Sequence, residues 1–361
     1  MTEWLSRARA GARAKIGRVR YIIIGTGAVG GTIGGCLALA GHEVVLTARG
    51  AHLDALCRHG LRLSTPSGTD TVAAPALGGP AEIDLRPGDV LVVATKSQDS
   101  VAVLTEWAGR PVAGGGTAGH DLLVICAQNG VANERFALRR FRRVYGMCVW
   151  LPAAHLAPGE VAAYGQPLAG LLWVGRYPAG ADATIERVAA DLAGSRFLAP
   201  VSQEVMRWKY RKLLGNLGNA IEALCVPLDT GLDGNAAAAA RELSERATAE
   251  GVAVLDAAGI GYASTAEMDE ARGHHVDYAP VAGAPRGGGS SWPSLTRGTG
   301  SIEADFLNGE VVLLGREHGV PVPVNEALQR LANRAAAGRL LPGSLSPEEI
   351  FAAAGASASD R

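Results

Sequence analysis

The feature that most constrains the fold is the stretch YIIIGTGAVGGTIGG at residues 21–35, where a β-branched run leads directly into a cluster of glycines. Successive isoleucines favour a buried strand, whereas glycine is unfavourable inside regular structure. Gly25, Gly27 and Gly30 have the spacing GxGxxG and open an apolar helix, which is the context of a dinucleotide-binding βαβ unit. The competing interpretation is a glycine-rich turn without a ligand.

In a dinucleotide-binding unit the three glycines have different roles. Gly25 permits the tight turn out of the strand, Gly27 lets the backbone approach a pyrophosphate, and Gly30 lets the helix lie close to the sheet. The free N–H groups at the helix N-terminus favour the phosphates. We therefore predict a cofactor-binding segment formed by Gly25, Thr26, Gly27, Ala28, Val29 and Gly30.

The first two hundred residues alternate short β-rich runs with helix-length stretches, which favours a doubly wound parallel sheet with crossover helices. Strands are expected at 21–24, 43–47, 90–94, 122–127 and 144–149, with 159–165 and 170–175 extending or flanking the sheet. Later residues are rich in helix formers, so an all-helical domain should follow. Its helices are expected over 204–225, within 235–259, near 302–318 and near 325–337, with an irregular segment over 259–290.

These patterns divide the chain into four segments: a basic extension over 1–18, a dinucleotide-binding α/β domain over 19–200, a helical domain over 201–345 and a flexible tail over 346–361. The extension lacks the apolar region of a secretory signal. Its arginine-rich composition is also that of a transit peptide, but a disordered extension is the simpler expectation.

Composition argues against several classes of function. A formal net charge of -1 offers no basic excess for nucleic acid, and no apolar run approaches the ~20 residues that span a bilayer. The five cysteines are scattered without a CxxC pair, and the eight histidines lack ligand spacing. We therefore expect no disulfide, no metal and a reducing cytoplasm. The apolar helix faces would serve either a homodimer or the domain's own core.

The end of the second expected strand bears on the choice of dinucleotide. NAD-specific folds place a carboxylate there for the ribose 2'-hydroxyl, but in HEVVLTARG the expected strand leads into Ala48 and Arg49. A guanidinium can instead bind a 2'-phosphate, and one charged hydrogen bond would favour NADPH by about 10- to 100-fold. The alternative is a solvated surface arginine.

Two further polar residues follow strands of the same sheet. Lys96 in VVATKSQD and Asn129 in CAQNG both fall at the carboxyl edge, where doubly wound folds bind ligands. Each alone is more often an ordinary loop residue. Together they favour a site at this edge.

The expected helix EVMRWKYRKLLGNLGNAIEAL carries a polar stripe. Lys212, Asn216 and Asn219 are spaced i, i+4 and i+7 and so share a face. Asparagine is a poor helix former, so the stripe indicates either a functional site or a satisfied interhelical network. Lys209 and Arg211 fall off this face and are expected to be solvated.

Ser291 and Glu303 lie in the last polar segment, SSWPSLTRGTGSIEADFLNGEVV. By itself Glu303 reads as a first-turn carboxylate that the helix dipole favours. The loop GAPRGGGSS before Ser291 could close over a site or be a plain linker.

Taken together, these motifs resemble the ketopantoate reductase (2-dehydropantoate 2-reductase) family over residues 20–337. The resemblance is carried by GTGAVG, Arg49, TKSQDS, QNG, KLLGN and SSW…RGTGSIEADFLNGEVV…HGVPVPVN. Its specific part is the Lys-Leu-x-x-Asn helix combined with Glu-x-Asp-x-x-Asn-Gly-Glu. It implies a Rossmann-type NADP-binding domain, a helical substrate domain, and reduction of ketopantoate to pantoate for pantothenate and coenzyme A synthesis.

The resemblance also implies roles for single residues. Lys212 would stabilise the charge on the ketone oxygen and donate the proton, and Glu303 would hold the charge of Lys212 and position the substrate. The cofactor would contact the glycine turn, Arg49, Lys96, Asn129 and Glu303. The substrate, a small 2-oxo acid, would contact Asn129, Asn216, Asn219 and Ser291.

The chain departs from the family pattern in two places, and both concern the substrate. The family often shows a second asparagine where this chain has Ala220, with Asn219 one residue earlier, and MCVWLPAAHLAPGEV replaces a run of small residues. The alternatives are a reductase of another 2-oxo acid, an opine-type dehydrogenase, and a non-enzymatic NADP-sensing protein.

Overall fold

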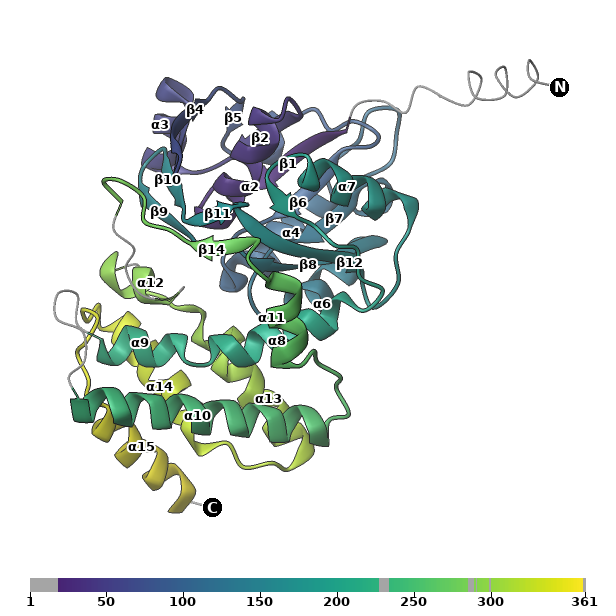
Figure 1. The fold of residues 1–361 in the computed structure, drawn as a ribbon. Helices are drawn as coiled ribbons and strands as arrows, with labels where there is room; N and C mark the ends of the chain where they lie inside the picture. The colour runs from purple at the N-terminus through teal and green to yellow at the C-terminus, as the bar shows by residue number, and fades with distance from the viewer. Residues whose placement is uncertain (1–18, 227–233, 285–288, 290, 299, 360–361) are drawn as a thin grey trace.

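The computed structural model describes residues 19–226, 234–284, 289, 291–298 and 300–359. The predicted basic extension over 1–18 lies outside these residues, as do 285–288 and 290 of the loop GAPRGGGSS. Two bodies are visible, an α/β domain (residues 19–198) and a helical domain (residues 205–359) whose helices lie beside the sheet (Figure 1).

The α/β domain is built on an eight-stranded sheet with strand order β13-β12-β8-β7-β6-β1-β2-β5. The chain leaves the central strand β1 in both directions, which is the doubly wound arrangement that the sequence predicts. Neighbouring strands of this sheet are parallel except β12 and β8, which pair antiparallel. The strands are β1 (Arg20–Ile24), β2 (Glu43–Thr47), β5 (Ala76–Leu77), β6 (Val90–Val93), β7 (Leu123–Cys126), β8 (Arg143–Trp150), β12 (Gly170–Arg176) and β13 (Phe197–Leu198).

Both faces of this sheet are covered by helices, so its strands are continuous apolar runs and β1 is buried along its whole length. Ile23 packs toward the core on one face, and its neighbours Ile22 and Ile24 pack toward the other. The covering elements are α2 (Ala28–Leu39), α3 (Gly50–His59), α4 (Ser100–Ala108), α5 (Ala118–Asp121), α6 (Asn133–Leu138) and α7 (Ala183–Ala193), with short 3-10 turns η1 (Pro80–Glu82) and η2 (Ser97–Asp99).

A four-stranded sheet of order β4-β3-β10-β9 covers the other side of α2. Its strands are β3 (Leu61–Thr65), β4 (Gly68–Val72), β9 (Ala153–Ala157) and β10 (Glu160–Ala163). A Cβ on Gly34 would lie 2.8 Å from Ile23 Cγ1 in the main sheet, and one on Gly31 would lie 2.9 Å from Val161 Cγ1 in this sheet. The glycines of α2 therefore let the helix fit between two sheets, in addition to any role in binding.

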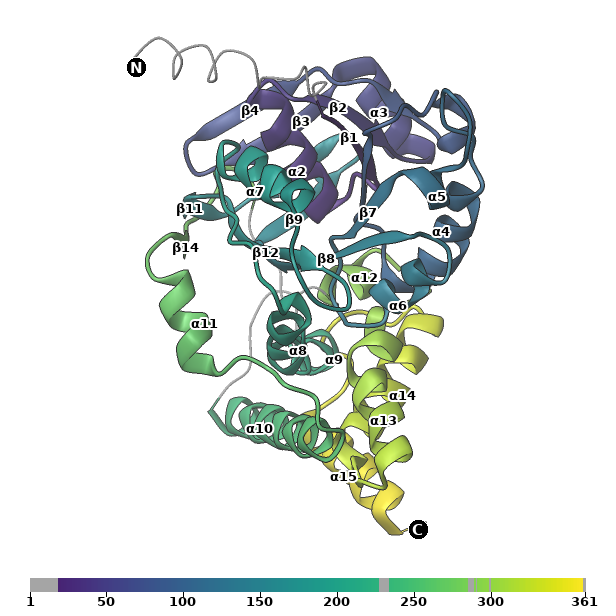
Figure 2. The ribbon, with the colours of Figure 1, turned by 90° about the vertical axis from the view of Figure 1, so that its right-hand side faces the viewer.

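The helical domain has its own core, and α8 lies between the main sheet and α10 (Figure 2). One strand of this half, β14 (Val276–Tyr278), returns to pair with β11 (Gly165–Pro167) of the α/β domain. The helices are α8 (Val205–Asn216), α9 (Asn219–Cys225), α10 (Gly234–Ala257), α11 (Thr265–Arg272), α12 (Trp292–Thr296), η3 (Glu303–Phe306), α13 (Asn308–His318), α14 (Pro323–Ala337) and α15 (Pro347–Ser359). None of the described helices is long and apolar enough to cross a membrane.

Three expectations for this domain are wrong. The segment expected to be irregular over 259–290 contains the helix α11 and the strand β14. The single helix expected over 204–225 is interrupted at residues 217–218 between α8 and α9. The flexible tail expected from residue 346 is α15, which places Ile350 in the core. Its start has a recognisable signal, because Ser346 and Glu349 exchange side-chain-to-backbone hydrogen bonds around Pro347, as in a capping box.

Candidate cofactor and substrate site

The glycine turn lies where β1 ends and α2 begins. Gly25 has φ +93°, in the left-handed region that favours glycine. A Cβ on Gly30 would lie 2.1 Å from Gly25 O, so a side chain there would push α2 off the sheet. In contrast, a Cβ on Gly27 would have no described atom within 4 Å. The turn is therefore open at the glycine that the motif reserves for a pyrophosphate.

The N-terminus of α2 also suits an anion. Its N-cap residue is Gly27, which offers no side-chain oxygen to the first N–H groups, and the first turn holds no carboxylate. Thr26 is buried and fixes the turn to β2, since its N and Oγ1 both donate to Thr47 O, at 3.0 and 2.9 Å. The residues present thus fit the phosphates of a dinucleotide.

His52, which the sequence did not single out, supports the same turn. Its Nδ1 accepts from Gly159 N at 2.8 Å, so Nε2 carries the proton and donates to Thr26 O at 2.7 Å. His155 lies beside it, and burial lowers the pKa of His155 to about 4. The partners of His52 are far apart in sequence, so no local pattern could have identified it.

Arg49 lies at the start of α3, after β2, and its side chain is 79% exposed. It forms an ion pair at 3.6 Å with Glu106 of α4. Such an exposed pair contributes about 0–1 kcal/mol, so the guanidinium can exchange it for a phosphate. Both interpretations of Arg49, a 2'-phosphate ligand and a surface charge, agree with this geometry.

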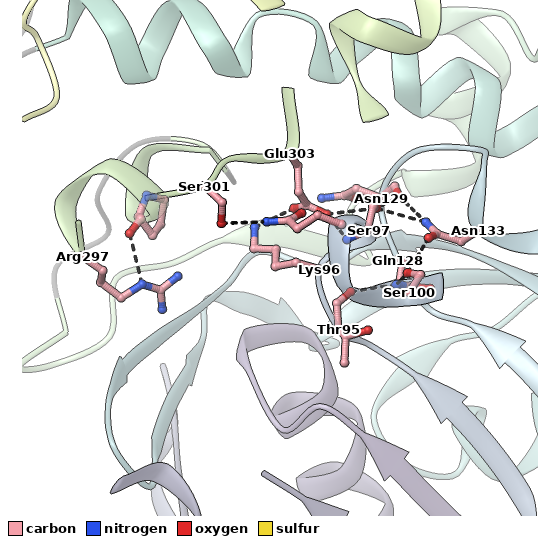
Figure 3. A network of polar contacts seen from close by, with 12 residues as sticks. Thr95, Lys96, Ser97, Ser100, Gln128, Asn129, Asn133, Arg297, Ser301 and Glu303 are labelled. Carbon is pink, nitrogen blue, oxygen red and sulfur yellow. Dashed lines mark hydrogen bonds and ion pairs between the residues drawn. The ribbon is translucent and has the colours of Figure 1, made fainter. Parts of the chain in front are cut away.

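A polar network joins the two domains at the carboxyl edge of the sheet (Figure 3). Lys96 Nζ donates to Glu303 Oε2 at 2.6 Å, and Ser97 donates to Glu303 Oε1 through its N at 3.0 Å and its Oγ at 3.1 Å. Glu303 is 4% exposed. It therefore binds the opposite domain and is not a solvated first-turn carboxylate.

The loops after β6 and β7 complete this network. Asn129 takes part through its backbone carbonyl oxygen, which accepts from Ser97 Oγ at 3.4 Å and from Asn133 Nδ2 at 3.2 Å. Gln128 Nε2 donates to Thr95 O at 2.8 Å. Within the described part of the chain, Gln128 Oε1 and Thr95 Oγ1 are buried without a hydrogen-bond partner. Such atoms are costly unless a ligand or water satisfies them, so they mark this edge as a binding surface.

Lys212 is half-buried on α8, and among the described residues it has no hydrogen-bond or ion-pair partner. Burial lowers the pKa of Lys212 to about 8, and the charge of Lys209 lowers it further, whereas Cys148 and Glu303 oppose the shift. Glu303 therefore acts on the charge of Lys212 through space, while its carboxylate oxygens bind Lys96 and Ser97.

The other predicted substrate residues fall in two groups. Asn216 lies one turn beyond Lys212 on α8, and its Nδ2 is buried with no hydrogen-bond partner among the residues that the structure describes. Asn219 lies after the helix break, where its Oδ1 would be 2.7 Å from a Cβ on Gly289. Ser291 is 3% exposed at the N-cap of α12, which packs on α9. Asn219 and Ser291 thus both lie near the start of α12.

The prediction that Lys209 is a solvated charge is wrong. Lys209 is 3% exposed and pairs with Glu134 of α6. Lys209 lies three positions before Lys212, so the two are neighbours on the helix surface, and the side of α8 that carries Lys209 packs on β8 and reaches Glu134 of α6. Among the described residues, Lys212 and Asn216 thus remain as an ammonium and an amide N–H donor without protein partners. Together they can bind and protonate an anionic oxygen.

Comparisons with known proteins agree with this geometry. The family model for ketopantoate reductase PanE/ApbA matches residues 21–179, and the model for the C-terminal part of the same family matches residues 204–336. A 2-dehydropantoate 2-reductase of Halobacterium salinarum is 30% identical over 325 residues, 88% of this chain and 99% of that protein. One of Archaeoglobus fulgidus is 26% identical, over 88% of this chain and 98% of that protein.

Solved structures of similar fold include a PanE/ApbA family ketopantoate reductase from Ralstonia eutropha, with a TM-score of 0.71, 27% identity, and coverage of 89% of this chain and 99% of that one. A D-mandelate dehydrogenase with NADH and anilino(oxo)acetate gives a TM-score of 0.70 at 20% identity, covering 89% of this chain and 99% of that one. At that identity the likeness concerns the fold alone.

Proposed function

Because the chain belongs to the ketopantoate reductase PanE/ApbA family, we propose that it reduces ketopantoate to pantoate with NADPH. The observation that carries this proposal is a pair of donors on α8 that have no partner in the described ranges of the chain, the ammonium of Lys212 and the Nδ2 group of Asn216. A ketone oxygen that gains charge needs hydrogen-bond donors directed at it, and donors without protein partners can serve this need without rearrangement.

NADPH, when bound, supplies the hydride. Gly25, Gly27 and Gly30 would hold its pyrophosphate at the start of α2, and Arg49 would bind its 2'-phosphate. The fit rests on the open position at Gly27, the N-terminus of α2 without a side-chain cap, and the orphaned oxygens of Thr95 and Gln128.

Lys212 would act on the substrate oxygen. With a pKa of about 8, its amine is mostly protonated at neutral pH, and the ammonium releases its proton more readily than that of an ordinary lysine. Asn216 would donate a second hydrogen bond to the substrate. Glu303 would keep the two domains in register through Lys96 and Ser97, and its charge would favour the protonated form of Lys212.

The identity of the 2-oxo acid is the least constrained part of this proposal. Ala220, where the family often has an asparagine, is 2% exposed and supplies no polar group. Asn219 precedes Ala220 in the sequence and carries an amide, but it begins α9 and lies against Gly289. This difference favours testing other 2-oxo acids alongside ketopantoate.

The test is the loss of NADPH absorbance with ketopantoate, compared with pyruvate and branched 2-oxo acids, and with NADH in place of NADPH. We expect the highest kcat/KM with ketopantoate and NADPH. A higher value with another 2-oxo acid would replace the substrate and keep the reaction class. NADPH binding without turnover on any of them would overturn the proposal in favour of a dinucleotide-sensing protein.

A further inference from the structure

The α8 helix carries a second lysine that the proposed reaction does not use. Lys209 and Glu134 form an ion pair whose side chains are 2% and 0% exposed. Glu134 belongs to α6 of the α/β domain, and Lys209 belongs to α8 of the helical domain, so the pair crosses the domain boundary. Buried ions need desolvation that apolar residues of similar volume would not, so such a pair is poorly explained by stability alone.

The surroundings of the pair are built to receive it. Gly146 of β8 has no side chain, and a Cβ there would lie 3.0 Å from Val205 Cγ1 and 3.4 Å from Glu134 Oε1. Cys148 of the same strand donates to Trp208 O at 3.4 Å. The face of α8 that carries Val205 and Lys209 is therefore seated on β8, and a rotation or a one-residue slip of α8 would leave both buried charges unpaired.

We propose that the Lys209–Glu134 pair is a positioning device for Lys212: it locks α8 in one register and holds a positive charge one helical turn from the Lys212 ammonium. Lys212 lies three positions after Lys209, so their side chains are neighbours along the helix surface. The inference rests on the proposed function, because it assigns the pair to the group that would donate the proton.

The charges around the two lysines predict the direction in which the pKa of Lys212 should change when Lys209 is replaced. Lys212 is influenced by Lys209 on its own helix, by Cys148 of β8 and by Glu303 of η3. Burial raises the pKa of the Cys148 thiol to about 11, and it raises that of Cys126 at the end of β7, so both thiols are neutral. The charges that act on Lys212 near its own pKa are therefore those of Lys209 and Glu303. Removing the charge of Lys209 should make Lys212 hold its proton more tightly.

The test compares the pH dependence of three variants of the full-length protein. Lys209→Met removes the positive charge, Glu134→Gln removes its partner, and the double variant removes both. We expect Lys209→Met and the double variant to raise the midpoint of Lys212 titration by about 1 pH unit, from Coulomb repulsion across one helical turn. Glu134→Gln should leave it in place, because Glu134 is not among the charges that influence Lys212. A purely structural role predicts the same direction for all three variants, or no shift.

The control is Arg207→Met, which removes another ion pair of α8, to Glu267 of α11, with N–O distances of 2.8 and 3.0 Å. That pair is partly exposed, and Arg207 is not among the charges that influence Lys212. The variant should leave the midpoint of Lys212 titration unchanged. A shift equal to that of Lys209→Met would refute a specific role for the buried pair.

Two readouts separate this inference from the proposed function. One is the descending limb of kcat/KM with NADPH and ketopantoate. The other is the ¹³C shift of the Lys212 ε-carbon in lysine-labelled protein, identified by its loss in Lys212→Arg. If the unmodified protein reduces no 2-oxo acid, the proposed function fails while the ¹³C titration still tests the pair. Equal midpoints for Lys209→Met and the unmodified protein would overturn the inference, and should either single variant fail to fold, the isosteric double variant decides.

Discussion

The pKa of Lys212 leads to a prediction that links burial to catalysis. The ammonium is the form that donates a proton, so reduction should fail as pH rises through the folded-state pKa of about 8. An ordinary lysine, with its pKa near 10.5, would keep the proton well beyond that point. The descending limb of kcat/KM for ketone reduction should therefore lie about two pH units below the position expected for a solvated lysine.

The expected magnitude follows from the protonated fraction. With a pKa of about 8, roughly 90% of Lys212 is charged at pH 7 and about 10% at pH 9, so the rate should fall by about tenfold between these values. Lys212→Arg keeps the charge and should remove this limb, because guanidinium does not titrate there. Lys212→Ala removes the donor and should lower kcat by about 10²- to 10⁴-fold.

The assay is NADPH oxidation at saturating cofactor from pH 6 to pH 10, with NADPH affinity measured separately by fluorescence. Arg211→Met, which alters the residue beside Lys212 in sequence, is the matched control and should keep the limb. A rate that stays constant to pH 10, or a Lys212→Ala variant that binds NADPH and loses less than tenfold in kcat, would show that Lys212 is not the proton donor.

Three other predictions concern the binding of cofactor and substrate. Arg49→Ala should weaken NADPH by about 10- to 100-fold and leave NADH unchanged, and an equal loss for both would make Arg49 a surface residue. Gly27→Ala has space for its Cβ and should fold normally while losing affinity for NADPH. In Gly30→Ala the Cβ would lie 2.1 Å from Gly25 O, so this variant should also lose about 1–3 kcal/mol of unfolding free energy and show a lower Tm. Thermal denaturation and cofactor titration check the two variants, and equal Tm values would contradict the packing argument. Asn216→Leu should raise KM for the 2-oxo acid at unchanged Tm, because its buried Nδ2 has no partner to lose; an unchanged KM would remove it from the site.

Several features of the fold could be read from the sequence because their causes are local. The strands of the main sheet begin and end within a residue of their expected positions at β1, β2, β6, β7 and β8. Their β-branched runs bury both faces, and that requirement is written in consecutive residues. The glycine turn is equally local, because its spacing carries the steric demands of the strand, the turn and the helix.

The break between α8 and α9 and the helix α15 show where local reading fell short. Leu217 and Gly218 keep helical dihedral angles, so the period continues although the helix is interrupted there. At α15 the residues Ser346 and Glu349 form a local capping signal, although a flexible tail is predicted there from the sequence. Ile350 is in the core because it meets a neighbouring helix, which the local sequence alone does not reveal.

The sequence by itself determined which residues could take part: a glycine turn after a buried strand, polar residues at two strand ends, and a helix face with Lys212 and Asn216. Only the tertiary structure decided their partners. Glu303 meets Lys96 across 207 positions, and Lys209 meets Glu134 across 75. Periodicity fixes the direction of a side chain within its own element, whereas its charge environment depends on which distant element packs against that face. For this reason the sequence could single out Lys212 as a candidate proton donor, but not the buried pair beside it.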